Sequence, residues 1–504
     1  MTTRRLARYA ALLLPLSLPS RAGSLEPAAE ASPTPIGIPD AAIRGVLVSG
    51  PDVPAQRDPE RLKAFAHTAT GEAVDFIGHV ESVSGDQAVV LGRRVNIAWT
   101  RFDGGGRLDL EPGMLVKVEG QGRVDGTLEA AVVTFQPERD AAKEAKIRSE
   151  TSKFKEKYFK KNKRYADEGV QRYVARIGQG LVPPYLAQGE RKFEFIVVED
   201  PTPNAFALPD GTVVVHTGIL ARMENEAQLA AVLGHELAHV TQRHYVRATE
   251  HETAETLLSI GARIASVALA LSKDQNAREA GQGIELISSA LQSGYSRFFE
   301  DEADVVGLRY MFLSGYDVRQ APELWANFHR FFGDESPVDN FFYGSHSTAM
   351  VREGNLNSEI RRAFEPARLV GGRVASTDFL RSVQPAIRDN AVLEAKKGWN
   401  GWAEADLRLA VSANPDDAKA LLALGQFLVA HHGNDSLADA VAAFRRAVEL
   451  DPRSAEAHRA LGLAYERMGA HSEARTELAL ALELAPEAAW APQLRAKLKR
   501  LGDG

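Results

Sequence analysis

The stretch AVLGHELAHVTQRH, residues 231–244, places His235 and His239 four positions apart, with Glu236 directly after the first. On a helix, residues four apart share a face, so both imidazoles can reach one metal ion at about 2.0–2.1 Å. Glu236 is rotated by about 100° from His235, where it can take a proton from water that the metal makes acidic. This HExxH arrangement is typical of a zinc site that activates water. Chance is the alternative in a chain with 13 histidines, so the pattern needs a third ligand.

A second segment supplies that ligand. In SRFFEDEADVVG, residues 296–307, Glu300 and Asp304 lie four apart on one helical face, and Glu302 points roughly the opposite way. Glu300 completes a two-histidine, one-glutamate site with an open position for water, and Asp304 can orient a ligating histidine. A solvated acidic helix face is the alternative, but it does not explain the matching HExxH. We therefore expect one zinc ion per chain, the divalent ion that suits this donor set best.

HELAH followed by SRFFEDEAD resembles the gluzincin family that includes HtpX, the BepA-type and Oma-type proteases and the CAAX prenyl proteases, over about residues 165–362. The resemblance implies a mainly helical peptidase domain with a small edge-strand sheet. It also implies roles for individual residues: zinc ligation by His235, His239 and Glu300, general base catalysis by Glu236, and support of the site by Asp304.

The segment PNAFALPDGTVVVHTGIL, residues 203–220, predicts two strands joined by a Pro-Asp-Gly turn. Its NAF tripeptide resembles the edge strand that gluzincins place beside the zinc. An edge strand has unpaired N–H and C=O groups, so an extended substrate can add to it as a further strand. Asn204, Ala205 and Phe206 would then bind substrate backbone, and an ordinary hairpin is the alternative.

Another segment that fits the family is GSHSTAMVRE, residues 344–353. His346 and Arg352 keep the six-residue interval of the relatives, but Ser347 replaces a proline. The resemblance implies that His346 approaches the metal, either as a donor to the oxyanion or as a fourth ligand that shuts the enzyme. We count both His346 and Arg352 among the catalytic candidates, and a hydrogen-bonded structural histidine is the alternative.

Other histidines show no partner pattern and are expected at the surface or at caps, for example His244, His251, His431 and His432. Between the two ligand segments, residues 254–272 are apolar apart from a few polar residues and Arg263. Integral relatives cross the membrane in this interval. Here the stretch is short and charged near its middle, which favours a buried or interfacial helix and makes it a candidate lid.

The first 22 residues resemble an export signal, with three arginines before a short apolar run, and a frayed amphipathic terminus is the alternative. The periplasm is the expected location. The chain has no cysteine, which excludes disulfides and lipoprotein-type acylation. A net charge of −7 gives no reason to expect nucleic acid as a partner.

The predicted fold is a multidomain α+β chain that begins with a small β domain. Five short strands with glycine-containing turns predict a small barrel or sandwich. Their order and spacing resemble a five-stranded barrel of the OB type, without the aromatic and basic stripe of nucleic-acid binders. A lysine-rich helix follows, with Phe154, Tyr158 and Phe159 expected to pack inward, and peripheral contact with a membrane surface is the alternative.

The last third of the chain carries a repeat that predicts an α-solenoid. Pro415, Pro452 and Pro486 close three helical pairs. The final pair matches the tetratricopeptide pattern at Leu461, Gly462, Tyr465, Ala474, Ala481 and Pro486, whereas Ala391 stands in the glycine position of the first. The expected boundaries are a signal peptide at 1–22, a linker at 23–40, the β-barrel domain at 41–137, the peptidase domain at 141–365, a linker at 366–385 and the repeats at 386–502.

Two functions are compatible with this organisation. The first is an exported zinc endopeptidase that cleaves misfolded or misassembled envelope proteins, with the repeats recruiting protein substrates or outer-membrane assembly partners. The second is a periplasmic chaperone or assembly scaffold whose peptidase is largely autoinhibited. Intact ligands and base favour the first, since a pure scaffold would not need them.

Overall fold

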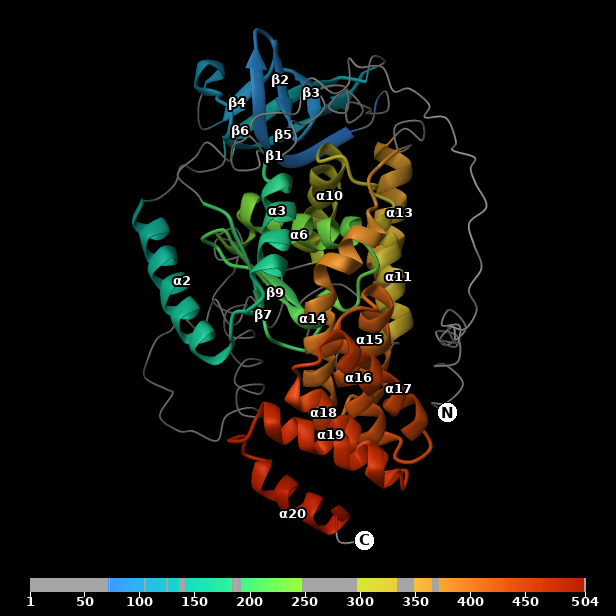
Figure 1. Cartoon of the computed structure of the whole chain (residues 1–504). Helices are drawn as coiled ribbons and strands as arrows, with labels where there is room; N and C mark the ends of the chain where they lie inside the picture. Colours follow the sequence, from blue (N-terminus) through green and yellow to red (C-terminus); the bar gives the residue numbers. More distant parts are fainter. Residues whose placement is uncertain are drawn as a thin grey trace, which may run out of the picture. The chain divides into compact units, whose positions relative to one another are not determined.

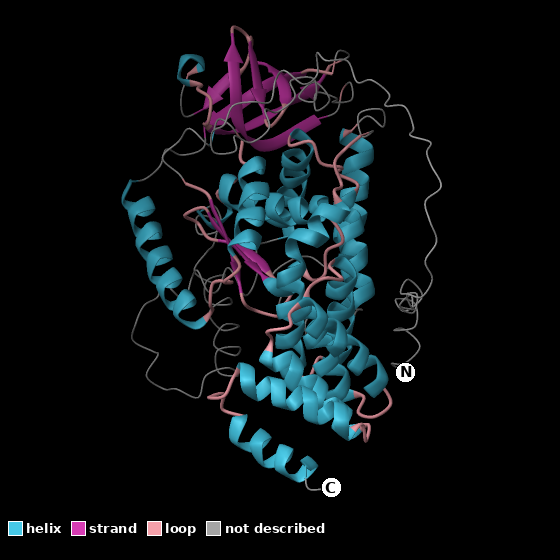
Figure 2. Ribbon diagram, in the orientation of Figure 1, coloured by secondary structure: helices cyan, strands magenta, loops and turns pink. Residues whose placement is uncertain are grey.

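The computed structural model describes the greater part of the chain (Figures 1 and 2). The described residues are 71, 73–103, 106–123, 126–135, 141–183, 186, 192–246, 297–332, 349–364 and 371–502. Several predicted features lie outside them: the signal peptide, the first linker, the apolar stretch 254–272 and His346. Within the described part, no helix combines the length and the apolar character that a membrane span requires.

The N-terminal sheet has six strands, where the sequence predicts five. They are β1 (Ala73–Ser84), β2 (Gln87–Val90), β3 (Arg93–Asn96), β4 (Arg101–Asp103), β5 (Leu115–Gly122) and β6 (Leu128–Phe135). Their order is β3-β2-β1-β5-β6-β4, and β3 also pairs with β6. The sequence misses β4 because three residues are too few to show an alternating pattern. Alternate apolar residues such as Val80, Val116 and Val118 form a core of this sheet's own.

A second, three-stranded sheet lies in the peptidase region and is buried on both faces. It contains β7 (Glu194–Val198), β9 (Thr212–His216) and β8 (Ala205–Ala207), in that order, with β8 antiparallel to β9. Side chains alternate between the faces, so Val197 and Val215 join the main core whereas Ile196 and Phe206 face the other way. The helix α2 (Ala141–Lys161) covers that other face.

The lysine-rich helix α2 attaches through its aromatic residues, as predicted. Phe154, Tyr158 and Phe159 pack against the second sheet. Tyr158 meets Phe206 edge-on at a ring-centroid distance of 5.4 Å, and its hydroxyl lies 2.9 Å from Nε2 of His216. Most of the lysines, such as Lys153, Lys157 and Lys160, are therefore exposed on the outer side of the helix, whereas Lys155 donates to Thr212 Oγ1 of the second sheet at 2.7 Å.

The peptidase region continues with helices that follow the lysine-rich α2. They are α3 (Glu168–Leu181), α5 (Thr217–Leu220), α6 (Glu226–Thr241), α10 (Arg297–Leu313), α11 (Gln320–Phe332) and α13 (Ala349–Ala363). Of these, α3, α10 and α11 pack directly against α6. Every residue of α6 is buried, and the Asn225 side chain caps its first turn by accepting from the backbone N–H of Gln228. A helix buried on all sides has no solvent face, which matches the apolar composition before His235.

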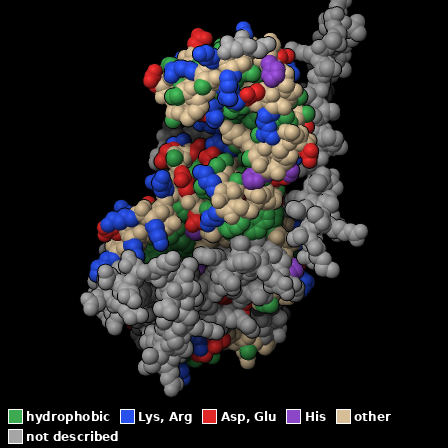
Figure 3. Space-filling view, turned by 90° about the horizontal axis from the view of Figure 1, so that it is seen from below, with side chains coloured by type: hydrophobic (Ala, Val, Ile, Leu, Met, Phe, Trp, Pro, Cys, Tyr) green, Lys and Arg blue, Asp and Glu red, His purple; other side chains and the backbone are tan. Residues whose placement is uncertain are grey.

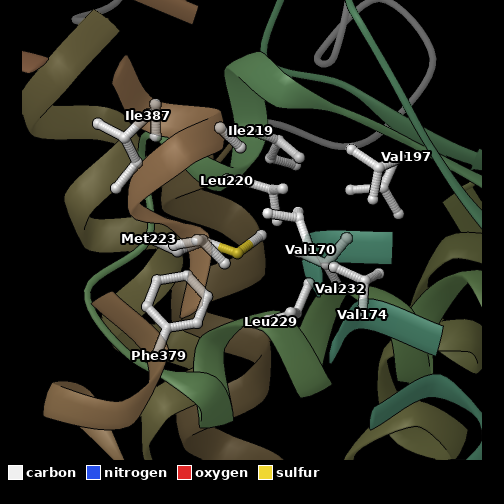
Figure 4. Close-up of a cluster of buried hydrophobic side chains, with 14 of the residues drawn as sticks. Val170, Val174, Val197, Ile219, Leu220, Met223, Leu229, Val232, Phe379 and Ile387 are labelled. Carbon is white, nitrogen blue, oxygen red and sulfur yellow. The ribbon is translucent and has the colours of Figure 1, made fainter. Parts of the chain in front are cut away.

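The repeats form seven helices, and the first belongs to the peptidase core as well. They are α14 (Ser376–Lys396), α15 (Asn400–Ala413), α16 (Ala418–His431), α17 (Leu437–Leu450), α18 (Ala455–Arg467), α19 (His471–Leu484) and α20 (Ala491–Gly502). Figure 4 shows Phe379 and Ile387 of α14 in the same buried cluster as Leu229 and Val232 of α6. The helix α14 thus begins inside the stretch 366–385 that the sequence suggests as a linker, because its apolar face completes the core.

Close-packing glycines appear where the repeat pattern places them. A Cβ on Gly425 would come within 2.4 Å of the Phe444 ring, and one on Gly462 within 2.7 Å of Leu478. The corresponding Ala391 of α14 is fully buried, so the first pair accommodates a methyl group there. Helices of the later pairs therefore approach each other more closely than a side chain at these positions would allow.

A buried charge cluster joins the peptidase region to the first repeat. Arg222, just after α5, donates to Asp406 of α15 at 2.6 Å and also to Glu394 of α14. Its guanidinium lies over the rings of Trp402 and Phe331, 5.2 and 5.3 Å from their centroids. Two carboxylates share one guanidinium, and burial together with the charge of Asp406 raises the pKa of Glu394 to about 8. One of the pair therefore holds a proton near neutral pH.

This proton makes the stability of the junction depend on pH. Between the unfolded pKa of 4.5 and the folded value of about 8, the folded chain binds the extra proton, so stability falls as pH rises. The steepest loss is about 1.4 kcal/mol per pH unit. We expect the thermal unfolding midpoint of the wild type to drop between pH 6 and 8, and Glu394→Gln to flatten that drop.

The exposed carboxylate Glu449 on α17 offers a matched control, since Glu449→Gln removes a surface ion pair with Arg446 only. That variant should keep the wild-type pH dependence. A Glu394→Gln protein whose midpoint falls as steeply as the wild type's would contradict the assignment of the proton to this cluster.

Candidate metal centre

The two helices that carry the predicted ligands touch through their backbones. A Cβ on Gly307 of α10 would lie 2.9 Å from the backbone N of His235, and one on Gly234 of α6 would lie 3.1 Å from the carbonyl oxygen of Gly307. Neither helix can present a side chain at this crossing. The close approach therefore brings Glu300, two turns before Gly307, beside the histidines of α6.

Three ligand atoms converge at this crossing. Nε2 of His235 and Nε2 of His239 are 3.0 Å apart, and the Glu300 carboxylate oxygens lie 3.4 and 3.6 Å from them. A tetrahedral zinc with bonds of about 2.05 Å holds its ligand atoms about 3.3 Å apart. Two imidazoles and one carboxylate with this spacing fit zinc, and all three side chains are buried.

Behind His235 lies a buried carboxylate and arginine pair. Nδ1 of His235 is 2.9 Å from Asp304 Oδ1, and Arg352 Nε donates to Asp304 Oδ2 at 2.9 Å. The Arg352 guanidinium also lies 3.7 Å from the ring centroid of Trp325. Burial opposes ionisation, but the Arg352 charge and the hydrogen bonds lower the pKa of Asp304 below its usual value. An ionised Asp304 can therefore orient the imidazole of His235.

Behind His239 lies a histidine that the sequence analysis places wrongly. His244 is expected at the surface or at a cap, yet it is fully buried, with Nδ1 2.8 Å from Nδ1 of His239. Its Nε2 lies 3.3 Å from Glu302 Oε2, and its ring stacks on Phe299. Counting along a regular helix hides these contacts, because α6 ends before His244. The sequence signal that could have indicated these contacts is a histidine five residues after the second histidine of HExxH.

The other predicted residues are distributed around this centre. Glu236 lies on α6 and is 2% exposed. Ala205 and Phe206 lie in β8, one of the two outer strands of the second sheet among the described strands, and the Asn204 carbonyl accepts from the backbone N–H of His216 at 3.0 Å. The Phe206 ring packs toward α2, so it supports the strand from behind. Arg352 contacts Asp304, which makes it a positioning residue in this geometry.

Comparison with known proteins agrees with the site. Residues 168–360 match Peptidase family M48, and residues 434–469 and 455–487 match tetratricopeptide repeats. Residues 77–134 match a domain of unknown function, DUF5666. The fold and the donor set define a metallopeptidase domain. Residues 168–360 are thus similar to peptidase family M48, and segments similar to tetratricopeptide repeats follow them.

Relatives share about a third of their length with this chain. The beta-barrel assembly-enhancing protease of Escherichia coli (strain K12) is 31% identical over 156 residues, which cover 31% of this chain and 32% of that protein. The mitochondrial metalloendopeptidase OMA1 of Schizosaccharomyces pombe is 36% identical over 154 residues, 30% of this chain and 42% of that protein. The tetratricopeptide domain of Arabidopsis OM64 covers 24% of this chain and 98% of its own, with 16% identity and a TM-score of 0.22.

The close contact between α6 and α10 at Gly234 and Gly307 predicts the effect of adding one methyl group at Gly307. Alanine in a helix interior is favoured over glycine by about 1 kcal/mol. At Gly307 the clash with the His235 backbone opposes that gain, and overpacking costs about 1–3 kcal/mol. We expect Gly307→Ala to lower the unfolding midpoint and to weaken zinc binding, measured by thermal melts and by competition with a chelator.

Gly354 in α13 is the matched control, since a Cβ there meets nothing within 4 Å. Gly354→Ala should leave zinc affinity unchanged and stability equal or higher. If Gly307→Ala behaves like Gly354→Ala, the contact between the two helices is not what positions the ligands.

Proposed function

We propose that the chain is an exported zinc-dependent endopeptidase that cleaves misfolded or misassembled proteins of the cell envelope. One observation carries the enzymatic part: His235, His239 and Glu300 converge with zinc spacing while Glu236 sits one residue from the first ligand on the same buried helix. The match to Peptidase family M48 over this region supports it. Periplasmic location and the nature of the substrate rest on the sequence and on the relatives.

The chemistry of the site follows from which groups are present. Zinc held by the three ligands would polarise the scissile carbonyl and make water acidic. Glu236 takes the proton from the attacking water and passes it to the leaving amine. Asp304 keeps His235 oriented, and Arg352 balances the charge of Asp304 inside the protein. Each of these residues acts from a rigid helix, which holds the geometry between turnovers.

Substrate binding is proposed for β8. The outer strand of a sheet offers backbone groups to an extended peptide, which adds as another strand with little sequence specificity. Asn204, Ala205 and Phe206 would provide these contacts. Such a site selects unfolded segments, because a folded protein does not present an extended strand of free backbone.

The repeats are the proposed recruiting surface for protein substrates or for outer-membrane assembly partners. Stacked helical pairs leave an extended surface on which a peptide or protein can bind. The name of the Escherichia coli relative links that protein to β-barrel assembly. On the face shown in Figure 3, described basic and acidic side chains lie interspersed, which favours protein partners over a polyanion.

A second candidate is a chaperone or assembly scaffold whose peptidase is largely autoinhibited. The repeat array packed against the peptidase core through α14 favours it, since such an array can act without cleavage. The two functions can coexist. An assembly phenotype rescued equally well by Glu236→Gln and by the wild type would favour the scaffold.

The test of the peptidase is a single isosteric substitution. Glu236→Gln removes the base but none of the ligands, so one zinc per chain should remain by metal analysis. Cleavage of casein or another unfolded protein should fall by about 10²–10⁴-fold. A wild type that binds stoichiometric zinc yet cleaves nothing, even after His346→Ala removes a possible fourth ligand, would overturn the enzymatic proposal.

A further inference from the structure

We infer that His244 and Glu302 form a positioning relay that fixes the tautomer and the orientation of the metal ligand His239. The relay runs from His239 Nδ1 to His244 Nδ1, and from His244 Nε2 to the Glu302 carboxylate. The inference rests on the zinc site proposed above. Neither residue occupies a defining position of the HExxH or the ExxxD motif; Glu302 stands at one of the variable positions between Glu300 and Asp304.

The hydrogen-bonding capacity of imidazole gives the relay a direction. Zinc bound to Nε2 of His239 leaves the proton of the neutral ring on Nδ1, which must donate. The only atom of His244 at donor–acceptor distance from it is Nδ1, 2.8 Å away, so that nitrogen accepts. The proton of His244 is then on Nε2, which donates to Glu302 Oε2 at 3.3 Å. Zinc bound at Nε2 of His239 would therefore determine which nitrogen carries the proton in both the His239 and the His244 ring.

The backbone is shaped to bring His244 back to His239. Residues five apart on a regular helix are separated by about 140° around the axis, too far to meet. Here α6 ends at Thr241, and Arg243 adopts φ 54°, the left-handed conformation that a non-glycine residue rarely adopts. Such strained residues cluster at functional sites and persist only where the surroundings hold them. The turn at Arg243 places the His244 ring against His239.

Packing then restricts the His244 ring to one orientation. The ring stacks on Phe299 at 4.7 Å between centroids with an interplanar angle of 27°. Phe299 directly precedes the ligand Glu300 on α10, so the same helix supplies the third ligand, the stacking surface and, through Glu302, the terminal acceptor. A ring held on one face by Phe299 and at both nitrogens by hydrogen bonds can hold its neighbour in turn.

The test measures metal affinity rather than activity. Replacing His244 with leucine removes the acceptor for His239 Nδ1, and loss of such a partner typically weakens metal binding about 10–100-fold. His244→Asn places an amide oxygen near the position of Nδ1, so it should recover most of the affinity. Zinc dissociation constants come from competition with a chromophoric chelator, and the visible spectrum of the cobalt-substituted full chain reports the ligand geometry.

A buried histidine outside the site provides the matched control. His458 in α18 is buried and hydrogen-bonded to Glu477 at 2.6 Å, so His458→Leu loses the same kind of contact. We expect it to keep wild-type zinc affinity and cobalt spectrum. Glu302→Leu should weaken zinc less than His244→Leu, because it removes the second link of the relay and leaves the first.

Several outcomes would overturn the relay. One is a His244→Leu protein with wild-type zinc affinity and cobalt spectrum, and another is a His244→Asn protein as weak as His244→Leu. If His244→Leu does not fold, the comparison of His244→Asn with His244→Gln is the test. The glutamine oxygen lies near the position of Nε2 rather than Nδ1, so it does not replace the acceptor for His239. Zinc binding by His244→Gln that equals or exceeds that of His244→Asn would contradict the relay. If the wild type binds no zinc, the proposed metal site itself is wrong. If the wild type binds zinc and the variants bind it equally well, only the relay is wrong.

Discussion

The backbones of α6 and α10 touch where Gly234 faces Gly307, and the positions of all three proposed zinc ligands follow from that contact. Packed helices with side chains between them lie about 8–10 Å apart. Without side chains at the crossing the two axes come closer, and a short glutamate side chain reaches two histidines on the neighbouring helix. The metal centre is therefore set by the absence of two Cβ atoms as much as by the ligands themselves.

The two histidine ligands are supported by different chemistry. His235 is held by an ionised carboxylate whose charge Arg352 balances, so this pair contributes no net charge to the centre. His239 is held by a second imidazole, with the carboxylate of Glu302 one ring further away. The ligand set then carries a single negative charge, from Glu300. A divalent cation held here would keep excess positive charge, which would make a bound water acidic and polarise a carbonyl.

The parts of the site that the sequence predicts are those that depend only on regular helix geometry. His235 with His239, and Glu300 with Asp304, can be paired by spacing because residues four apart share a face. His244 cannot be placed in this way, since its position depends on where α6 ends and on the left-handed turn at Arg243. The repeats and five of the six N-terminal strands are recognisable from their own periodicity.

Contacts between distant segments are not visible in the sequence. Arg222 meets Asp406, 184 residues away, and nothing in the pattern near either residue marks the other as its partner. The helix α14 is a similar case: residues before the first strong repeat carry no repeat signature, so the stretch suggests a linker. Its burial becomes apparent only when the core of the peptidase region is assembled.

The helix α14 also has a consequence for how the molecule behaves as a unit. Phe379 and Ile387 of this helix pack in the peptidase core, and Gln384 of the same helix donates to Asp417 at the start of α16. A helix that is packed into both the peptidase core and the repeats transmits force between the two regions. A protein pulling on the repeats pulls on the core that holds the metal ligands, and the array cannot swing on a hinge at this point without opening that core.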